Sequence, residues 1–193
     1  MKTLESPKLA APGAGLPAPE RAIARLMLGF RCRTGNRESF DAHFKSERAK
    51  IRKLIATPAP ESLSRRVLIA RPRGLEDSSR DWSVLMTLDH LRIVNAAFAG
   101  IIASLANGKE PEGQASTAAV KPDPAVTIEV IAEYESGCDA LLEKVAGVPE
   151  LKTKARYRHP WFWKMNAHEW HALAGGHMGI HRVQIERIIA GLS

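Results

Sequence analysis

The segment Asn166–Ala190 decides the fold of this chain, and it reads NAHEWHALAGGHMGIHRVQIERIIA. Asn166 is a good helix N-cap, and Glu169, three residues later, can complete a capping box. Apolar residues and two histidines then recur at helical spacing along one stripe: Trp170, Leu173, Ala174, His177, His181, Ile185 and Ile188. The stripe predicts a helix packed against a core, with His177 and His181 facing inward one turn apart.

Two inward imidazoles one turn apart suit a metal ion, since both rings can reach an ion at about 2.0–2.1 Å. The alternative is a pair of core histidines satisfied by hydrogen bonds. Burying two imidazoles without any partner is costly, so the pair needs some partner in either case. His177 and His181 alone leave both interpretations open, and a third ligand elsewhere in the chain would favour the metal.

The composition is that of a soluble globular protein, with 45% hydrophobic and 25% charged residues in a chain of 193. This length fits one domain with a tail. Residues 1–19 contain several prolines and glycines and no continuous apolar run, so we expect a flexible N-terminal tail and no signal peptide. Residues 20–193 are then expected to form a single helical-bundle domain.

The formal net charge of +7 indicates attraction to anions, but the basic residues are scattered. Basic and acidic residues interleave in Ser46–Lys53, as on a solvated helix face, so a nucleic-acid partner is not expected. Cys32 and Cys138 are far apart and match no ligand pattern, which favours reduced thiols in a cytoplasmic protein. The apolar run Ala96–Ala106 is too short to span a bilayer, so no membrane association is expected.

Apolar periodicity predicts helices over four further segments: Glu20–Arg33, Ser39–Ala56, Asp81–Asn107 and Pro122–Val145. Thr34-Gly35-Asn36 indicates a break, although Glu20–Ala56 could be either two helices or one interrupted helix. No alternating strand pattern, glycine-rich phosphate loop or internal repeat is present. The predicted fold is all-α: a four-helix bundle with long crossover connections and an extra N-terminal helix.

A third inward histidine comes from the segment Asp81–Asn107. His90 falls on its apolar stripe, which consists of Trp82, Met86, His90, Ile93, Val94, Ala97 and Ile101. His90, His177 and His181 are therefore the candidate metal ligands. Three protein ligands leave a coordination position open, which is the catalytic arrangement rather than the closed structural one.

Four motifs occur in order along the chain: Trp82-Ser83 with Leu88-Asp89-His90-Leu91, then His159-Pro160-Trp161-Phe162, then His177-Met178-Gly179-Ile180-His181, then Gln184-Ile185. With these motifs the chain resembles the DinB-like (YfiT-like) superfamily of metal-dependent proteins over roughly Phe40–Ala190. The resemblance implies a four-helix bundle, often a homodimer, with a divalent metal on His90, His177 and His181. Some members are thiol-dependent S-transferases or isomerases that use low-molecular-weight thiols. The N-terminal helix lies outside the common core of the family.

These observations lead us to expect a divalent-metal-binding protein, with zinc or nickel as the ion. Its expected activity is that of a metal-dependent transferase or hydrolase acting on a small molecule, which the resemblance suggests is a low-molecular-weight thiol. The alternative is a non-catalytic metal-binding protein with a stress-related structural or interaction role. No catalytic residue is assigned.

Other candidates receive lesser roles. His168 and His171 point away from the stripe and are expected to face solvent or loops. Asp89 is a minor candidate for a carboxylate supporting His90, and His159 for an acid or base at the mouth of the site. Glu169 is read as a capping residue. Cys138 is expected to pack in the core. Trp161, Phe162 and Trp163 are also expected to pack in the core, with lining of a pocket as the alternative.

Overall fold

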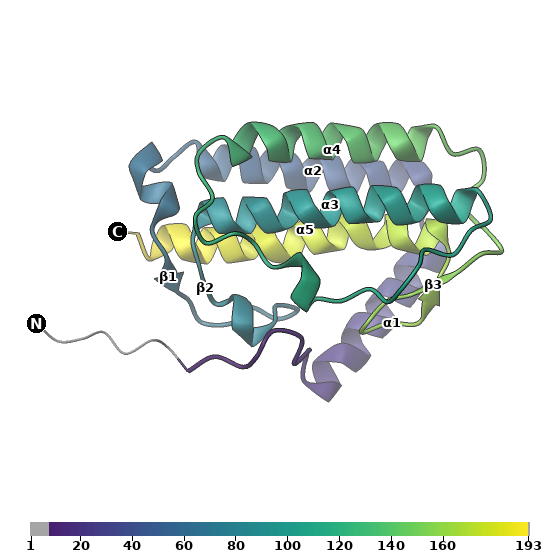
Figure 1. Cartoon of the computed structure of the whole chain (residues 1–193), viewed down its shortest axis with the longest axis horizontal. Coiled ribbons are helices and arrows are strands. Elements are labelled where there is room, and N and C mark those ends of the chain that lie inside the picture. The colour runs from purple at the N-terminus through teal and green to yellow at the C-terminus, as the bar shows by residue number, and fades with distance from the viewer. Residues whose placement is uncertain (1–7, 193) are drawn as a thin grey trace, which may run out of the picture.

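The computed structural model describes residues 8–192 and contains five α-helices (Figure 1). They are α1 (Ala18–Thr34), α2 (Arg37–Ile55), α3 (Val84–Ala106), α4 (Val130–Ala146) and α5 (Ala167–Ala190). Helices α2 to α5 run side by side along the long axis, while α1 lies obliquely at one end (Figure 1). α3 packs against α4 and α5, and α2 packs against α5. The predicted four-helix bundle with an additional N-terminal helix is confirmed.

Long connections join the bundle helices and carry short elements. Between α2 and α3 lie η1 (Pro60–Ser64), β1 (Val67–Leu68), η2 (Asp77–Ser79) and β2 (Asp81–Trp82). η3 (Ala118–Val120) precedes α4, and β3 (Tyr157–Arg158) and β4 (Lys164–Met165) precede α5. β1 pairs antiparallel with β2, and β3 with β4. Two-residue strands are too short to produce an alternating sequence pattern, which is why none was predicted.

Two helices begin later than the first residue of their predicted segments. For the segment Asp81–Asn107 the sequence offers Asp81 or Ser83 as N-cap, and Ser83 is the cap: its hydroxyl accepts a hydrogen bond from Met86 N at 3.1 Å, while Asp81 and Trp82 pair with β1, so the helix begins at Val84. The helix expected from Pro122 begins at Val130. In the preceding loop Asp123 N donates to Asp89 Oδ2 at 2.9 Å, and Ala125 N donates to Asp123 Oδ1 at 2.8 Å. These side-chain acceptors hold the backbone outside the helix.

The segment Glu20–Ala56 forms two helices. Gly35 ends α1, and Asn36 starts α2 with a capping box in which its side chain accepts from Ser39 N at 3.0 Å. The Phe40 ring packs directly on Gly35, where a Cβ atom would overlap the ring and lie 2.9 Å from the Arg31 carbonyl oxygen. Gly35 is therefore required by the close approach of Phe40.

Two features mark the described N-terminal part of the chain: contacts of the segment before α1, and exposed apolar side chains on α1. Residues 1–7 of the expected flexible tail lie outside the described residues, but Ala10 N donates to Asp77 Oδ2 at 2.8 Å and Leu16 is buried. The described part of the tail is thus bound to the bundle. On α1, Leu28 is buried, while four large apolar side chains are 58–75% exposed: Ile23, Leu26, Met27 and Phe30.

α3 is a long, apolar helix that packs between α4 and α5. It is long and apolar enough to cross a membrane by length and composition, yet most of its apolar stretch is buried inside the structure. Leu88, Leu91 and Ile102 on this helix are fully buried among the neighbouring helices. This is the pattern of a core helix.

The close approach at Gly35 predicts the effect of adding one methyl group. Gly35→Ala should lower the free energy of unfolding by about 1–3 kcal/mol, because Phe40 must move from its site. Gly100→Ala is the control: its Cβ meets nothing within 4 Å and should stabilise α3 by roughly 0.5–1 kcal/mol. Thermal or urea unfolding measures both changes, and equal effects of the two substitutions would contradict the packing at Gly35.

Candidate metal centre

The packing of α3 on α5 brings His90, His177 and His181 together. One ring nitrogen from each of the three lies within 4.8 Å of the others. His90 Nε2 and His177 Nε2 are 3.3 Å apart. His90 and His181 are buried and His177 is half-buried. The group predicted from helical periodicity therefore converges on one point and could hold a metal ion.

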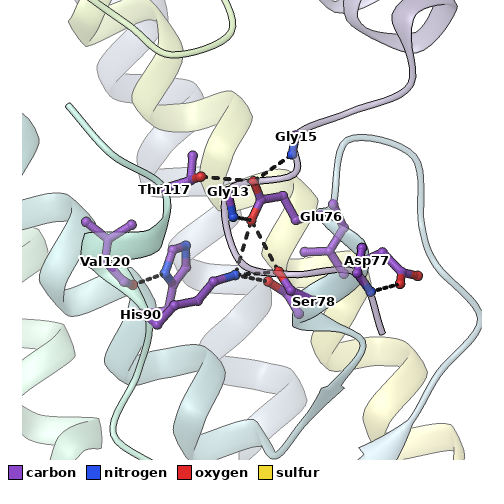
Figure 2. A network of polar contacts seen from close by, with 12 residues as sticks. Gly13, Gly15, Glu76, Asp77, Ser78, His90, Thr117 and Val120 are labelled. Atoms are coloured by element: carbon purple, nitrogen blue, oxygen red, sulfur yellow. Dashed lines mark hydrogen bonds and ion pairs between the residues drawn. The ribbon is translucent and has the colours of Figure 1, made fainter. Parts of the chain in front are cut away.

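Neighbouring residues fix the orientation of two imidazoles. His90 Nδ1 donates to the Val120 carbonyl oxygen at 2.6 Å (Figure 2), and His181 Nδ1 donates to Gln184 Oε1 at 2.7 Å. The Gln184 amide in turn donates to the Ser79 carbonyl oxygen at 2.7 Å, which sets its direction. With Nδ1 protonated in both rings, each Nε2 keeps a lone pair for a cation.

The protonation state also suits metal binding. Burial lowers the pKa of His90 to about 4. Burial likewise holds the pKa of His177 and of His181 well below 6.5, and the neighbouring histidines lower both further. All three imidazoles are therefore neutral near pH 7, which is the form that coordinates metals. His177 Nδ1 is buried and has no hydrogen-bond partner among the described residues.

Aromatic rings support the imidazoles. The Trp82 ring stacks on His181 at a centroid distance of 6.3 Å and an interplanar angle of 7°, and lies 5.3 Å from His90. The Phe98 ring meets His177 edge-on at 5.7 Å. Trp82 is held by its pairing with β1, so the short sheet contributes directly to the position of the histidines.

A cavity of about 350 Å³ adjoins the three histidines. Trp161 and Phe162 line it, so the expectation of simple core packing was incomplete for these two rings. Trp163 lies elsewhere, with its Nε1 donating to Glu169 Oε1 at 2.9 Å. His159 also lines the cavity, where its Nδ1 accepts from Trp161 N at 3.1 Å and burial lowers its pKa to about 3.

The prediction that His168 and His171 face solvent or loops was wrong. His168 is 6% and His171 1% exposed. His168 Nε2 donates to the Cys32 carbonyl oxygen at 3.0 Å, and His171 Nε2 lies 2.9 Å from Asp41 Oδ1. Because α1 and α2 cover further faces of α5, residues outside the main stripe are buried too. Neither histidine belongs to the three-histidine group.

The remaining candidates have structural contacts. Asp89 pairs with Arg92 at 2.6 Å and accepts from Asp123 N, so it anchors the loop before α4 rather than supporting His90. Glu169 is a capping residue, as expected, and accepts from Asn166 N at 2.8 Å. Cys138 is fully buried as expected, and burial raises the pKa of its thiol to about 12.

A buried carboxylate, Glu76, forms a polar cluster beside the cavity (Figure 2). It accepts from Gly13 N at 3.4 Å, Gly15 N at 3.2 Å and Thr117 Oγ1 at 2.9 Å. Lys121 Nζ donates to Glu76 Oε2 at 3.2 Å. Sequence reasoning missed this cluster, because its members come from three separate segments without a shared motif.

Comparison with known proteins supports the fold and leaves the family open. No protein-family model matches the chain, and no curated protein matches it. The crystal structure of TT2238, a four-helix bundle protein, superposes with a TM-score of 0.57 at 20% sequence identity. The alignment covers 78% of this chain and 98% of that one. The chain is therefore similar to a four-helix bundle protein in fold.

The contacts of His171 predict a structural role for this residue. His171→Ala should lower the free energy of unfolding by about 1–3 kcal/mol, because it leaves Asp41 without its buried partner. Metal binding should remain at the wild-type level, since the imidazole is outside the three-histidine group. Unfolding curves and metal titration of the same preparation check both points. A variant that lost metal while keeping full stability would reverse this assignment.

Proposed function

We propose that this protein binds one divalent transition metal ion through His90, His177 and His181 and acts on a small molecule in the adjoining cavity. The observation that carries the proposal is the convergence of three buried imidazoles at the wall of that cavity. A structural metal site is expected to be sealed and to have four protein ligands. Three ligands beside a cavity instead leave a position for a substrate.

The donor set fits such an ion. All three candidate donors are imidazole nitrogens, which suit zinc or nickel better than magnesium or calcium. His90 and His181 each have Nδ1 engaged by a neighbouring oxygen, as is usual for metal-binding histidines. Because the three imidazoles are neutral at pH 7, none of them has to release a proton before it binds the metal ion.

A bound divalent ion would act as a Lewis acid and lower the pKa of a coordinated water or thiol. The protein itself supplies orientation and a dry environment. Trp82 and Phe98 hold the imidazoles, and apolar walls limit access of water. Since His159 Nδ1 accepts from Trp161 N, the neutral ring carries its proton on Nε2 and can donate a hydrogen bond to a bound molecule.

This chemistry fits a metal-dependent transferase that uses a thiol, or a hydrolase. A thiol cosubstrate is suggested by the sequence resemblance to thiol-dependent S-transferases. A lowered thiol pKa would generate the thiolate nucleophile, and a lowered water pKa would generate hydroxide. Assays with zinc-loaded protein in the presence and absence of a thiol separate the two reaction types.

Metal titration tests the proposal directly. Metal-free protein should bind one zinc or nickel ion per chain, and His177→Ala should weaken binding by more than about 100-fold, beyond the effect typical of a residue that only supports a ligand. His171→Ala, on the same helix, is the matched control and should bind normally. Calorimetry or a competing chelator gives the affinities. Normal binding by His177→Ala would refute the assignment of ligands.

The same variant tests the relation of metal to fold. His177→Ala and metal-free wild type should keep their helical circular dichroism, because large buried side chains each contribute roughly 1.5–3 kcal/mol to the core. Metal should raise the melting temperature of the wild type only, by linkage of binding to folding. Unfolding of the metal-free wild type would show that the ion is structural, and the proposed activity would lose its support.

A further inference from the structure

Three aromatic side chains with unused polar groups line the cavity together: Tyr157, His159 and Trp170. The ring centroids of His159 and Tyr157 lie 5.3 Å and 6.1 Å from that of Trp170. Trp170 is 1% exposed, and its buried Nε1 has no hydrogen-bond partner among the described residues. A buried N–H group without a partner is rare and costly in a folded protein. The indole of Trp170 therefore requires an acceptor.

His159 supplies a second donor. Its Nδ1 accepts a hydrogen bond from Trp161 N at 3.1 Å, so the proton of the neutral ring is on Nε2. Within residues 8–192, neither this Nε2 nor the Tyr157 hydroxyl makes a hydrogen bond. An indole N–H and an imidazole N–H can only donate, and a phenol O–H can donate as well. We call Tyr157, His159 and Trp170 the donor wall, because a ligand that meets it must carry an acceptor.

The charges around the cavity favour an uncharged acceptor. Lys121 is the only Lys or Arg among the described residues that line the cavity. Its Nζ contacts Glu76 Oε2 at 3.2 Å, Ser78 Oγ at 2.8 Å and Ser79 Oγ at 3.0 Å, which uses all three N–H donors of an ammonium group. A carboxylate at the donor wall would be buried without a counterion, which is costly. A carbonyl oxygen accepts hydrogen bonds without that cost.

The donor wall is separate from the three histidines. Trp170 and His177 are seven residues apart on α5, which is two turns or about 10 Å along the helix axis. The Phe98 ring contacts both, at centroid distances of 5.5 Å from Trp170 and 5.7 Å from His177. A metal–ligand bond is only about 2 Å long. An oxygen bonded to Trp170 is thus a recognition group and not a ligand of the metal centre.

We propose that the cavity binds a small molecule whose uncharged carbonyl oxygen accepts hydrogen bonds from the donor wall, about two helical turns from the metal centre. This ligand class rests on the proposed function, since it names what the cavity beside the metal centre takes. Tyr157, His159 and Trp170 then determine specificity, and the volume of about 350 Å³ restricts the ligand to roughly a single ring or a short chain.

Two ring compounds that differ only at the acceptor test the inference: cyclohexanone and methylenecyclohexane, in which a CH₂ group replaces the oxygen. Proton–nitrogen correlation NMR of metal-free protein follows the indole N–H resonances, and the signal of Trp170 is assigned by its loss in Trp170→Phe. Cyclohexanone should move this signal downfield, as a new hydrogen bond does, and methylenecyclohexane should not. An unmoved signal at saturating cyclohexanone, or no binding of cyclohexanone, would overturn the inference.

Variants show whether the donors set the preference. Trp170→Phe removes the N–H but keeps an aromatic ring, and should weaken cyclohexanone binding about tenfold more than methylenecyclohexane binding. Tyr157→Phe is nearly isosteric and should show the same selective loss, by about threefold or more. Trp163→Phe is the control, because its indole donates to Glu169 Oε1 outside the cavity, and should change neither affinity. Equal weakening of both compounds by Trp170→Phe and Tyr157→Phe would contradict the donor wall.

Two further results separate this ligand class from the proposed function. If zinc does not bind but cyclohexanone moves the Trp170 signal, the metal assignment fails and the donor wall stands. If zinc binds through the three histidines but cyclohexanone leaves the signal unmoved, the metal centre stands and the donor wall fails. Tighter binding of cyclohexanecarboxylate than of cyclohexanone to metal-free protein would make the ligand an anion and would also overturn the inference.

Discussion

The packing of α3 against α5 is the contact on which the site depends. It places His90 opposite His177 and His181, with ligand nitrogens within 4.8 Å. Three polar rings at a helix interface require compensation, because unpaired imidazoles are costly to bury. Hydrogen bonds to Val120 and Gln184 supply part of it, while His177 Nδ1 has no partner among the described residues. We infer that a metal ion compensates the ring nitrogens that converge between the two helices.

The long connections between the helices orient the histidines and cover part of the cavity. Val120, which orients His90, is the last residue of η3, and Ser79, which orients Gln184, is the last residue of η2. Trp82 on β2 stacks against His181. The N-terminal segment bonds to Glu76 and covers part of the cavity. The helices carry the histidines, but loops that run over the bundle determine the tautomer and orientation of the imidazole rings and the access to the cavity.

Periodicity was sufficient to predict the bundle and the three histidines, because burial of an amphipathic helix imposes a regular spacing on its core residues. Periodicity failed for residues that are buried by an element packed on a second face of the helix. His168 and His171 lie off the main stripe but are covered by α1 and α2, which a single-face pattern does not reveal. The loop before Val130 is held to α3 by Asp123 N, which donates to Asp89 Oδ2 from 34 residues further along the chain. The Glu76 cluster was missed for the same reason.

X-ray absorption spectroscopy of the zinc-loaded protein tests the central claim most directly. Three imidazole ligands should surround the ion at about 2.0–2.1 Å, together with one oxygen ligand or the sulfur of an added thiol. His90→Ala should reduce the imidazole count by one, because His90 is the ligand that α3 contributes. A spectrum with fewer than three imidazoles in the wild type, or an unchanged spectrum for His90→Ala, would contradict the assignment of the site.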